Sequence, residues 1–421
     1  MDREKLIGLR REFRKIAEPG WLEIQTTIKI IEYLKELGYE VKYGKSIHAE
    51  DRLGVPPKEE YEDYLSRITL PEVEFEIDEI VEGYTGVVAY LDTENPGKTI
   101  GIRVDIDALY LKETNDPEHI PNKLGFRSEN DFACHGCGHD GHITIGLGIA
   151  DYIMTNKNSL KGKYVIIFQP AEEGVRGAKS ITEAGILDEV DYFMSAHIGM
   201  DEEAGVLGVG TGGFLGTTKF DIKFHGVPTH AGTTPENGRN ALLAASSCAL
   251  NLHTLPQVGA GMSRLNVGVL NAGSGRNVVP SEAILKMEVR GENSSITDLL
   301  SERTEQVAKG AAVAFDVDYG IEKVGAAAAF NTIHPEFVDY VGEKMREKGY
   351  KTHMRPNLGA SEDVSYMLEK VEENGGRVIH YLLGTKLKAP HHNDKFDYGE
   401  EVLEFGVNVF IDTIKLYNEL D

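Results

Sequence analysis

From Thr85 onward, short β-branched runs alternate with segments of helical periodicity, and this alternation limits the folds open to the chain more than any other feature. Helices are expected between these runs, from about His142 and near Ala178. Strands and helices that alternate in this way are typical of layered α/β proteins, because each helix buries its apolar face on the sheet. We therefore predict an α/β fold. The strand-like runs are residues 86–91, 99–104, 164–168 and 192–196.

Two amphipathic helices are expected before this region. Apolar residues recur at helical spacing from Leu6 to Ile16 and again from Ile24 to Leu37. Gly38 follows the second helix, and glycine is the usual residue where a helix ends in a left-handed turn. The polar stretch from Ser46 to about Glu74 contains prolines, so we expect an excursion on the surface there.

A second domain is expected to interrupt the first. Residues 215–327 have the order strand, helix, strand, strand, helix, strand, with the last strand at Phe315 to Ile321. This order is typical of a compact α+β, ferredoxin-like unit. The helix–strand pattern then resumes with a helix from Pro335. We therefore predict one discontinuous domain, residues 1–214 and 328–421, and an inserted domain, residues 215–327.

The glycine-rich segment 208–213 formally contains G-x-G-x-x-G, the pattern of dinucleotide-binding loops. That pattern requires a helix directly after the glycines, whose N-terminus holds the pyrophosphate. Residues 217–225 are predicted to form a strand instead. We interpret the glycines as a hinge, because clustered glycines free the backbone at a domain junction.

The formal net charge is −24, from 44 Lys and Arg against 68 Asp and Glu. An acidic surface of this kind disfavours a nucleic-acid or anionic-membrane partner, because like charges repel. The first residues lack an apolar leader, and no stretch approaches the roughly 20 apolar residues that span a bilayer. We expect a cytoplasmic protein. The three cysteines, an odd number, predict reduced thiols.

Residues 134–142, Cys-His-Gly-Cys-Gly-His-Asp-Gly-His, form the first cluster of residues with metal-ligand character. Cysteine thiolates and imidazoles both suit zinc and similar ions. Two alternatives are open for this cluster. Cys134 and Cys137 form a Cys-x-x-Cys pair that could be a redox site, and the loop could be a structural one with hydrogen-bonded histidines.

Three further clusters follow apolar segments. Glu172 and Glu173 come directly after a buried strand, so one carboxylate can bind metal while the other acts as a general base toward a metal-bound water. His197 closes another apolar strand, and His391 and His392 lie near the carboxyl end. A lone histidine is usually structural, but four such clusters together predict a metal site.

Other catalytic templates are missing from the sequence. It contains no H-E-x-x-H, no P-loop and no G-x-S-x-G elbow. The zinc deaminase pattern also fails, because no H-x-E element precedes the cysteine pair.

With these motifs the chain resembles the metallo-aminohydrolases that include aminoacylases, carboxypeptidase G and the indole-acetyl-amino-acid hydrolases, nearly from end to end. This resemblance implies a mixed-sheet domain with two divalent metals, manganese or zinc with cobalt and nickel as alternatives. It also implies a smaller lid domain that forms a homodimer. The strings that carry it are residues 168–174 (FQPAEEG), 273–280 (GSGRNVVP), 359–363 (GASED) and 391–397 (HHNDKFD).

The resemblance also implies roles for residues of the first domain. Glu172 would be the general base, and Asp105 would support the metal centre from behind, although it could equally be a turn acid after a strand. Cys137 would take the bridging place that a carboxylate has in other branches. The implied metal ligands are Cys137, His139, Glu173, His197 and His392.

In the insert, the resemblance implies that His230 stabilises the oxyanion in the partner subunit's site. Arg276, Asn277 and Arg290 would hold the substrate carboxylate, for which a guanidinium is well suited. From its sequence context alone, His230 would be an ordinary loop histidine. Arg290 could equally form a surface salt bridge.

Two positions depart from the family pattern. An additional cysteine, Cys134, stands close to the implied ligand Cys137, and Asp394 stands where the family often has proline. A thiol beside a ligand could bind metal wrongly or oxidise. Neither departure removes a ligand.

We therefore predict metal-dependent hydrolysis of the amide bond of an N-acyl amino acid, such as p-aminobenzoyl-glutamate or a similar acyl acidic amino acid. The predicted attacking group is a metal-bridged water. Alternatives are an aminoacylase or carboxypeptidase with another acyl group, and a non-catalytic partner subunit. The expected partners are the small-molecule substrate and a second copy of the chain, and a related second subunit is a further candidate.

Overall fold

The computed structural model describes residues 1–420, which form two compact units. The first unit consists of Met1–Gly212, Asn331–Leu358 and the residues from Asp363 onward. The second consists of Gly213–Phe330 and Gly359–Glu362. Residues 215–327, the expected insert, lie within the second unit.

The first unit is built on one eight-stranded sheet with the order β1-β2-β4-β3-β5-β12-β6-β11. Its four central strands β4, β3, β5 and β12 run parallel, whereas β1, β2 and β6 pair antiparallel with their neighbours toward the centre. The sheet is therefore mixed, which confirms the predicted fold class. The strands are β1 (Glu40–Tyr43), β2 (Val87–Asp92), β3 (Thr99–Asp105), β4 (Lys163–Gln169), β5 (Tyr192–Ile198), β6 (Val206–Val209), β11 (Lys351–Met354) and β12 (Arg377–Leu383).

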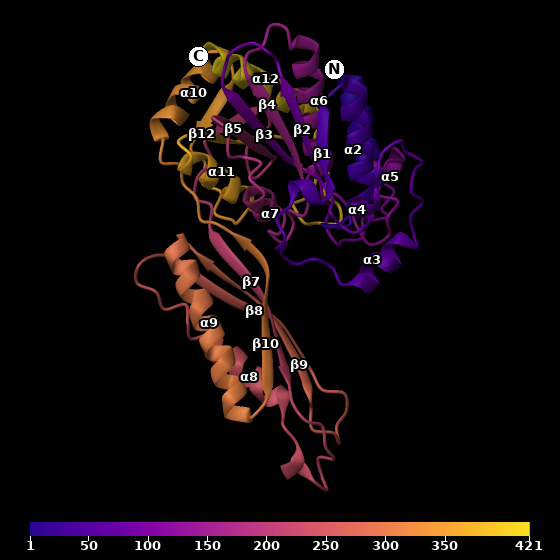
Figure 1. Cartoon of the computed structure of the whole chain (residues 1–421), viewed down its shortest axis with the longest axis vertical. Coiled ribbons are helices and arrows are strands. Elements are labelled where there is room, and N and C mark those ends of the chain that lie inside the picture. The colour runs from indigo at the N-terminus through magenta and orange to yellow at the C-terminus, as the bar shows by residue number, and fades with distance from the viewer. Residues whose placement is uncertain (421) are drawn as a thin grey trace. The chain divides into compact units, whose positions relative to one another are not determined.

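Helices cover both faces of this sheet (Figure 1). Helices α6 and α12 pack on one face, together with α1 and α2, and α7 and α11 lie together on the other. The helices are α1 (Arg3–Lys15), α2 (Ile24–Leu37), α3 (Lys58–Leu65), α4 (Asp78–Val81), α5 (Ile120–Lys123), α6 (His139–Asn156), α7 (Ala178–Glu183), α10 (Pro335–Glu347), α11 (Val364–Glu373) and α12 (Glu401–Glu419), with a 3-10 turn, η1 (Gly44–Ile47).

The two amino-terminal helices begin and end where the sequence predicts. Asp2 caps α1 by accepting a hydrogen bond from the backbone amide of Lys5. Gly38 ends α2 with φ +93°, a left-handed conformation that glycine adopts without steric cost.

The stretch from Ser46 to Glu74 is only partly an excursion on the surface, which corrects the sequence prediction. It contains α3, and the side chains of Ile47, His48 and Tyr64 are buried. Tyr64 and Ile47 fill space beside α2 and the sheet edge, so this polar segment contributes to the core.

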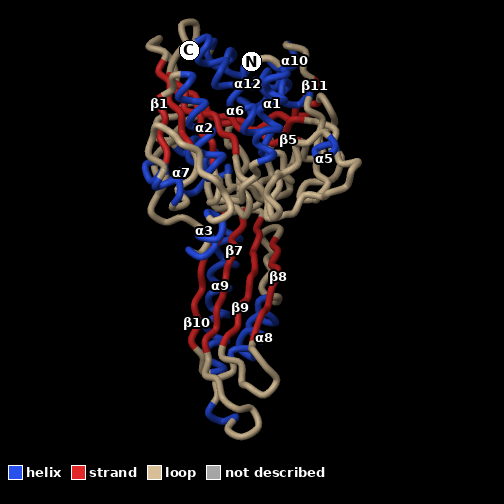
Figure 2. Tube along the Cα trace, turned by 90° about the vertical axis from the view of Figure 1, so that its right-hand side faces the viewer, coloured by secondary structure: helices blue, strands red, loops and turns tan. Residues whose placement is uncertain are grey.

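The second unit has a four-stranded antiparallel sheet, order β10-β7-β9-β8, with two helices packed on one face (Figure 2). Its last strand begins at Asp318 and not at Phe315, because α9 continues to Phe315 and Asp316 ends it in a left-handed conformation with φ +53°. The elements are β7 (Gly216–His225), η2 (Pro235–Asn237), α8 (Ala241–Leu252), β8 (Ser263–Ala272), β9 (Glu282–Gly291), α9 (Ser294–Phe315) and β10 (Asp318–Ala327).

The glycine-rich segment 208–213 runs from β6 to the junction of the two units. The next regular element is β7, a strand, as the sequence predicts, so a dinucleotide-binding loop is excluded. Among residues 1–420, no helix has the length and apolar composition needed to cross a membrane.

Candidate metal centre

The predicted metal ligands of the first unit gather at the carboxyl ends of its parallel strands. His197 lies on β5 and Glu173 follows β4, while Cys137 and His139 stand at the start of α6. The carboxyl ends of neighbouring parallel strands share one edge of the sheet, where ligands of open α/β proteins bind. Gly138, with φ +91°, turns the chain into α6 between Cys137 and His139.

Two triads of ligand atoms overlap at Cys137. The first combines Cys137 with His139 and His197, and the second combines it with Glu173 and His392. In each triad the ligand atoms all lie within 4.8 Å of one another. The Cys137 Sγ atom is 3.5 Å from Nε2 of His197, and Nε2 of His392 is 3.5 Å from Oε1 of Glu173. One thiol is therefore shared by two groups of donors.

Hydrogen bonds fix which nitrogen of each imidazole faces this cluster. The Nδ1 atom of His139 donates to the carbonyl of Asp107 at 2.8 Å, and Nδ1 of His197 donates to the carbonyl of Ile198 at 2.9 Å. Each ring then carries its proton on Nδ1 and presents the lone pair of Nε2. Neutral imidazoles held in this way are suited to bind a metal.

Buried donors without hydrogen-bond partners test whether a cation fits this site. Among the described residues, Nε2 of His139 and Oε1 of Glu173 are buried and accept no hydrogen bond. Burial raises the pKa of Glu173 to about 7 and raises the pKa of the Cys137 thiol well above its usual value. A divalent cation would satisfy these atoms and favour the ionised carboxylate and thiolate. The donor set therefore fits a metal.

Glu172 lies beside this donor set. Its side chain is largely buried, and its Oε2 atom is 4.0 Å from Nε2 of His139. With Glu173 and His139 it forms a further group whose ligand atoms lie within 4.8 Å of one another. A carboxylate at this position is within reach of a small molecule held by the neighbouring donors.

His392 is the most exposed of the predicted ligands, with 58% of its side chain accessible. Its backbone φ of +62° is unusual for a residue with a side chain, and its amide donates to the carbonyl of Gly136 at 2.9 Å. This bond ties the 391–397 string to the loop before Cys137. The neighbouring His391 points elsewhere, with Nε2 donating to the carbonyl of Ile198.

Asp105 stands behind the cluster at the end of β3. Its Oδ1 atom accepts from Nδ1 of His142 at 2.5 Å and lies 3.6 Å from Nδ1 of His139. His142 also accepts from the amide of Ile198, so both its nitrogens are used within the protein. Burial alone would raise the pKa of Asp105, but His139, His142 and Arg103 outweigh it and hold the pKa well below its usual range. Asp105 is therefore an ionised support for this group of histidines.

The sequence prediction missed Asp107. Its carboxylate accepts hydrogen bonds from the backbone amides of Glu172 at 3.0 Å and Glu173 at 2.9 Å, one on each oxygen. Its carbonyl orients His139. The available signal was its position two residues after Asp105, but the strand ends at Asp105, so alternation could not say where Asp107 points.

The loop from Pro170 to Gly177 is strained. Ala171 and Val175 have φ of +52° and +60°, in the left-handed region that costs a residue with a side chain about 1–2 kcal/mol. Buried carboxylates hold the loop at both ends. Glu23 accepts from the amide of Ala171 at 2.7 Å, and Asp363 accepts from the amides of Gly177 and Ala178.

The predicted lid residues lie in the second unit and divide into two places within it. The amide of Ala231 donates to the carbonyl of Asn277, and His230 pairs with Val278, so His230, Arg276 and Asn277 belong to one pair of loops. These loops lie beyond the start of β9. Arg290 is near the end of that strand, roughly 27 Å away at about 3.4 Å per residue, and forms the salt bridge with Glu288 that the sequence left as an alternative.

The imidazole of His230 has a defined orientation. Its Nδ1 atom accepts from the amides of Gly232 and Thr233 at 3.1 and 3.2 Å, so its proton is on Nε2. The side chain is exposed. Within its own unit, His230 therefore presents an N–H donor to the outside.

Cys134 and its neighbour His135 are not part of the donor set. Burial raises the pKa of the Cys134 thiol to about 12, and all three cysteines are free. A buried thiol with a raised pKa is a poor nucleophile, so these features do not favour the redox alternative.

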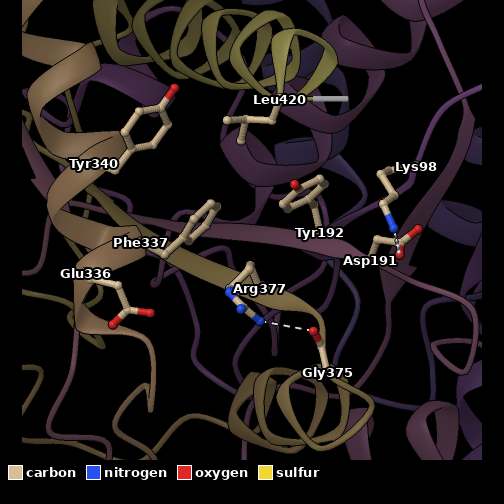
Figure 3. Close-up of a pocket in the computed structure, with 9 residues that line it drawn as sticks. All are labelled: Lys98, Asp191, Tyr192, Glu336, Phe337, Tyr340, Gly375, Arg377 and Leu420. Atoms are coloured by element: carbon tan, nitrogen blue, oxygen red, sulfur yellow. Dashed lines mark hydrogen bonds and ion pairs between the residues drawn. The ribbon is translucent and has the colours of Figure 1, made fainter.

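A separate hollow lies at the opposite end of the sheet, at the amino ends of β3, β5 and β12. Its volume is about 490 Å³, and Figure 3 shows Tyr192 and Phe337 above Arg377, with Lys98 paired to Asp191 at one side. None of the predicted site residues lines it.

Comparison with known proteins agrees with this geometry. The model of peptidase family M20/M25/M40 matches residues 101–416. A Haemophilus influenzae protein, a homolog of one p-aminobenzoyl-glutamate hydrolase chain, is 43% identical over 99% of both sequences. The indole-3-acetyl-aspartic acid hydrolase of Enterobacter agglomerans is 42% identical over 94% of this chain and 92% of its own.

A solved structure gives the same result. The aminobenzoyl-glutamate utilization protein from Klebsiella pneumoniae has a TM-score of 0.82 and 37% identity, covering 98% of this chain and 95% of its own. With a family match over most of its length and relatives above 40% identity, the chain belongs to peptidase family M20/M25/M40 and is a hydrolase of amide bonds.

Proposed function

We propose that the protein hydrolyses the amide bond of N-acyl acidic amino acids in a two-metal site, with Glu172 as the general base. The observation that carries the proposal is the pair of donor triads that share Cys137, next to the largely buried carboxylate of Glu172. A glutamate or aspartate leaving group is supported by the names of the two relatives, which refer to aminobenzoyl-glutamate and indole-acetyl-aspartate.

Five residues would hold the metals: Cys137, His139, Glu173, His197 and His392. Two bound divalent cations would polarise the amide carbonyl and lower the pKa of a water molecule to near neutrality. Manganese or zinc suits thiolate, imidazole and carboxylate ligands, with cobalt and nickel as alternatives.

The remaining steps belong to residues of the chain. Glu172 takes a proton from the attacking water and returns it to the leaving amine, for which its position beside His139 is suited. Asp107 holds the backbone of Glu172 and Glu173, so the base and a ligand keep a fixed distance. Asp105 supports the histidines from behind.

The second unit would act as the lid and dimerisation domain, with residues 1–214 and 328–421 as the catalytic domain. The partner subunit's His230 would stabilise the oxyanion, a role that its Nε2–H donor supports. Arg276 and Asn277 would come with it, whereas Arg290, at the other end of β9, would bind the substrate carboxylate from a different side. Arg290 would then have to leave Glu288 or share its guanidinium.

The experiment is the rate of p-aminobenzoate release from p-aminobenzoyl-glutamate by the purified protein, with manganese or zinc and with a chelator control. Indole-acetyl-aspartate and neutral N-acyl amino acids are the comparison substrates. Metal-dependent release with preference for the acidic substrates is the expected result. Equal rates on neutral substrates would overturn the acidic preference, and metal binding without hydrolysis of any of them would favour a required second subunit or a non-catalytic role.

A further inference from the structure

Glu23 lies outside the segment that matches the family model, yet its side chain reaches the loop that carries Glu172. It stands at the start of α2, and its side chain is completely buried. Its Oε1 atom accepts a hydrogen bond from the amide of Ala171 at 2.7 Å, and its Oε2 atom accepts one from the hydroxyl of Thr85 at 2.7 Å. Both oxygens are therefore used.

Ala171 is the residue directly before Glu172, and its backbone is in the left-handed region. A strained backbone persists only where its surroundings hold it. The amides of Ala171, Glu172 and Glu173 donate in succession to Glu23 and to the two oxygens of Asp107. These three bonds set the direction in which the Glu172 side chain leaves the loop.

We infer that Glu23 is a positioning residue for catalysis, which holds Ala171 in its left-handed conformation and thereby aims the Glu172 carboxylate at the metal site. This inference rests on the proposed role of Glu172 as the base. Glu23 itself touches neither substrate nor metal ligands in the described contacts.

The chemistry of the Glu23 side chain suggests a conservative replacement. Burial and the neighbouring Asp107 raise the pKa of Glu23 to about 8, so its carboxyl group is largely protonated at neutral pH. A protonated carboxyl can accept from Ala171 on one oxygen and donate to Thr85 from the other. A glutamine amide offers the same acceptor and donor.

Glu18 provides a matched control. It is equally buried on the same segment, and its side chain accepts hydrogen bonds from Gln25, Thr26 and Tyr64 instead of from the catalytic loop. Glu18→Met should therefore destabilise the fold, as Glu23→Met does, without redirecting Glu172.

The test compares Glu23→Met, Glu23→Gln and Glu18→Met in the metal-loaded protein. We expect Glu23→Met to lower kcat about 10- to 100-fold, the range for lost supporting contacts, with KM and bound metal within about twofold of the parent. Amide hydrogen exchange in the segment 169–178 should become faster in Glu23→Met alone. Glu23→Gln should keep both kcat and slow exchange.

Equal kcat in Glu23→Met and Glu18→Met, or unchanged exchange in the loop, would overturn the inference. If Glu23→Met does not fold, Glu23→Asp, which is one methylene too short to reach Ala171, must lose kcat where Glu18→Asp does not. A Glu172→Gln variant measured alongside separates the two claims: full turnover by that variant would refute the proposed base, whereas its loss beside an active Glu23→Met would refute only the role of Glu23.

Discussion

Asp107 accepts a hydrogen bond from the backbone amide of Glu173 at 2.9 Å, so a buried acid fixes the position of a predicted metal ligand through its main chain and not its side chain. The other oxygen of the same carboxylate fixes Glu172. The general base and its neighbouring ligand are thus held by one group. Such an arrangement keeps the base at a constant distance from the metals while the substrate changes.

Replacement of Asp107 by asparagine should separate this role from general stability. The amide keeps one acceptor oxygen but turns an N–H toward the second backbone donor, so one bond is lost and a repulsion replaces it. We expect kcat to fall about 10- to 100-fold. Asp191→Asn is the matched control, because Asp191 also accepts a backbone amide, that of Thr99, at the opposite end of β3. Similar kcat losses in both variants would contradict a specific role.

The two cysteines of the 134–142 cluster should differ sharply on substitution. Cys137→Ser replaces the shared thiolate by a weaker, harder donor, so we expect loss of bound metal and at least about a 100-fold loss of activity. Cys134→Ser should keep both, since Cys134 belongs to neither donor triad. Metal content per chain, measured by atomic emission after dialysis, decides the matter. Full metal occupancy in Cys137→Ser would refute the bridging assignment.

His48 predicts a loss of stability in mild acid. Burial, with the nearby Arg52 adding to it, lowers the pKa of His48 to about 4, below the usual 6.5 of an unfolded chain. The unfolded state therefore binds a proton more readily, and the free energy of unfolding falls as pH drops from about 6.5 toward 4. This one group accounts for about 3 kcal/mol across that window.

The measurement is urea unfolding at pH 7 and at pH 4.5 for the parent and for His48→Gln. The glutamine variant should be less stable at pH 7 but lose less on acidification, because glutamine does not titrate. His253→Gln, at an exposed position, should keep the pH dependence of the parent. An unchanged slope in His48→Gln would show that other groups dominate.

Mixed dimers test whether His230 acts in trans. Neither His230→Ala nor Glu172→Gln homodimers should turn over substrate at a significant rate. A mixed dimer restores one complete site if the base and the oxyanion donor come from different subunits. We expect partial activity after the two variants are unfolded, mixed and refolded together, and none when each is treated alone. Absence of complementation, with mixed dimers shown by mass spectrometry, would place His230 in its own subunit's site or outside catalysis.

Much of the donor set could be predicted from the sequence because its residues follow recognisable strands or open a helix. His197 ends the apolar run of β5, and Glu172 and Glu173 follow β4, so alternation and strand direction bring them to one edge. The supporting contacts were less visible. Asp107 and Glu23 act through backbone amides of a loop far away in the chain, and hydrogen bonds of this kind leave no periodic pattern.

Boundaries and local packing also escaped the sequence pattern. Phe315 looks like the start of a strand, but Asp316 adopts a left-handed conformation and lets α9 run one turn further before β10. The polar stretch around Tyr64 looks like a surface excursion, although the Tyr64 hydroxyl donates to buried Glu18 and its ring is covered. In both places a tertiary contact overrides the local composition.

The measurement that tests the central claim most directly is turnover of p-aminobenzoyl-glutamate by Glu172→Gln, with bound metal and thermal stability determined on the same sample. The account predicts two metals per chain, an unfolding temperature close to that of the parent, and a kcat lower by several orders of magnitude, because an amide cannot take the proton from water. A variant that keeps its metals and hydrolyses the substrate at a near-parental rate would contradict the account.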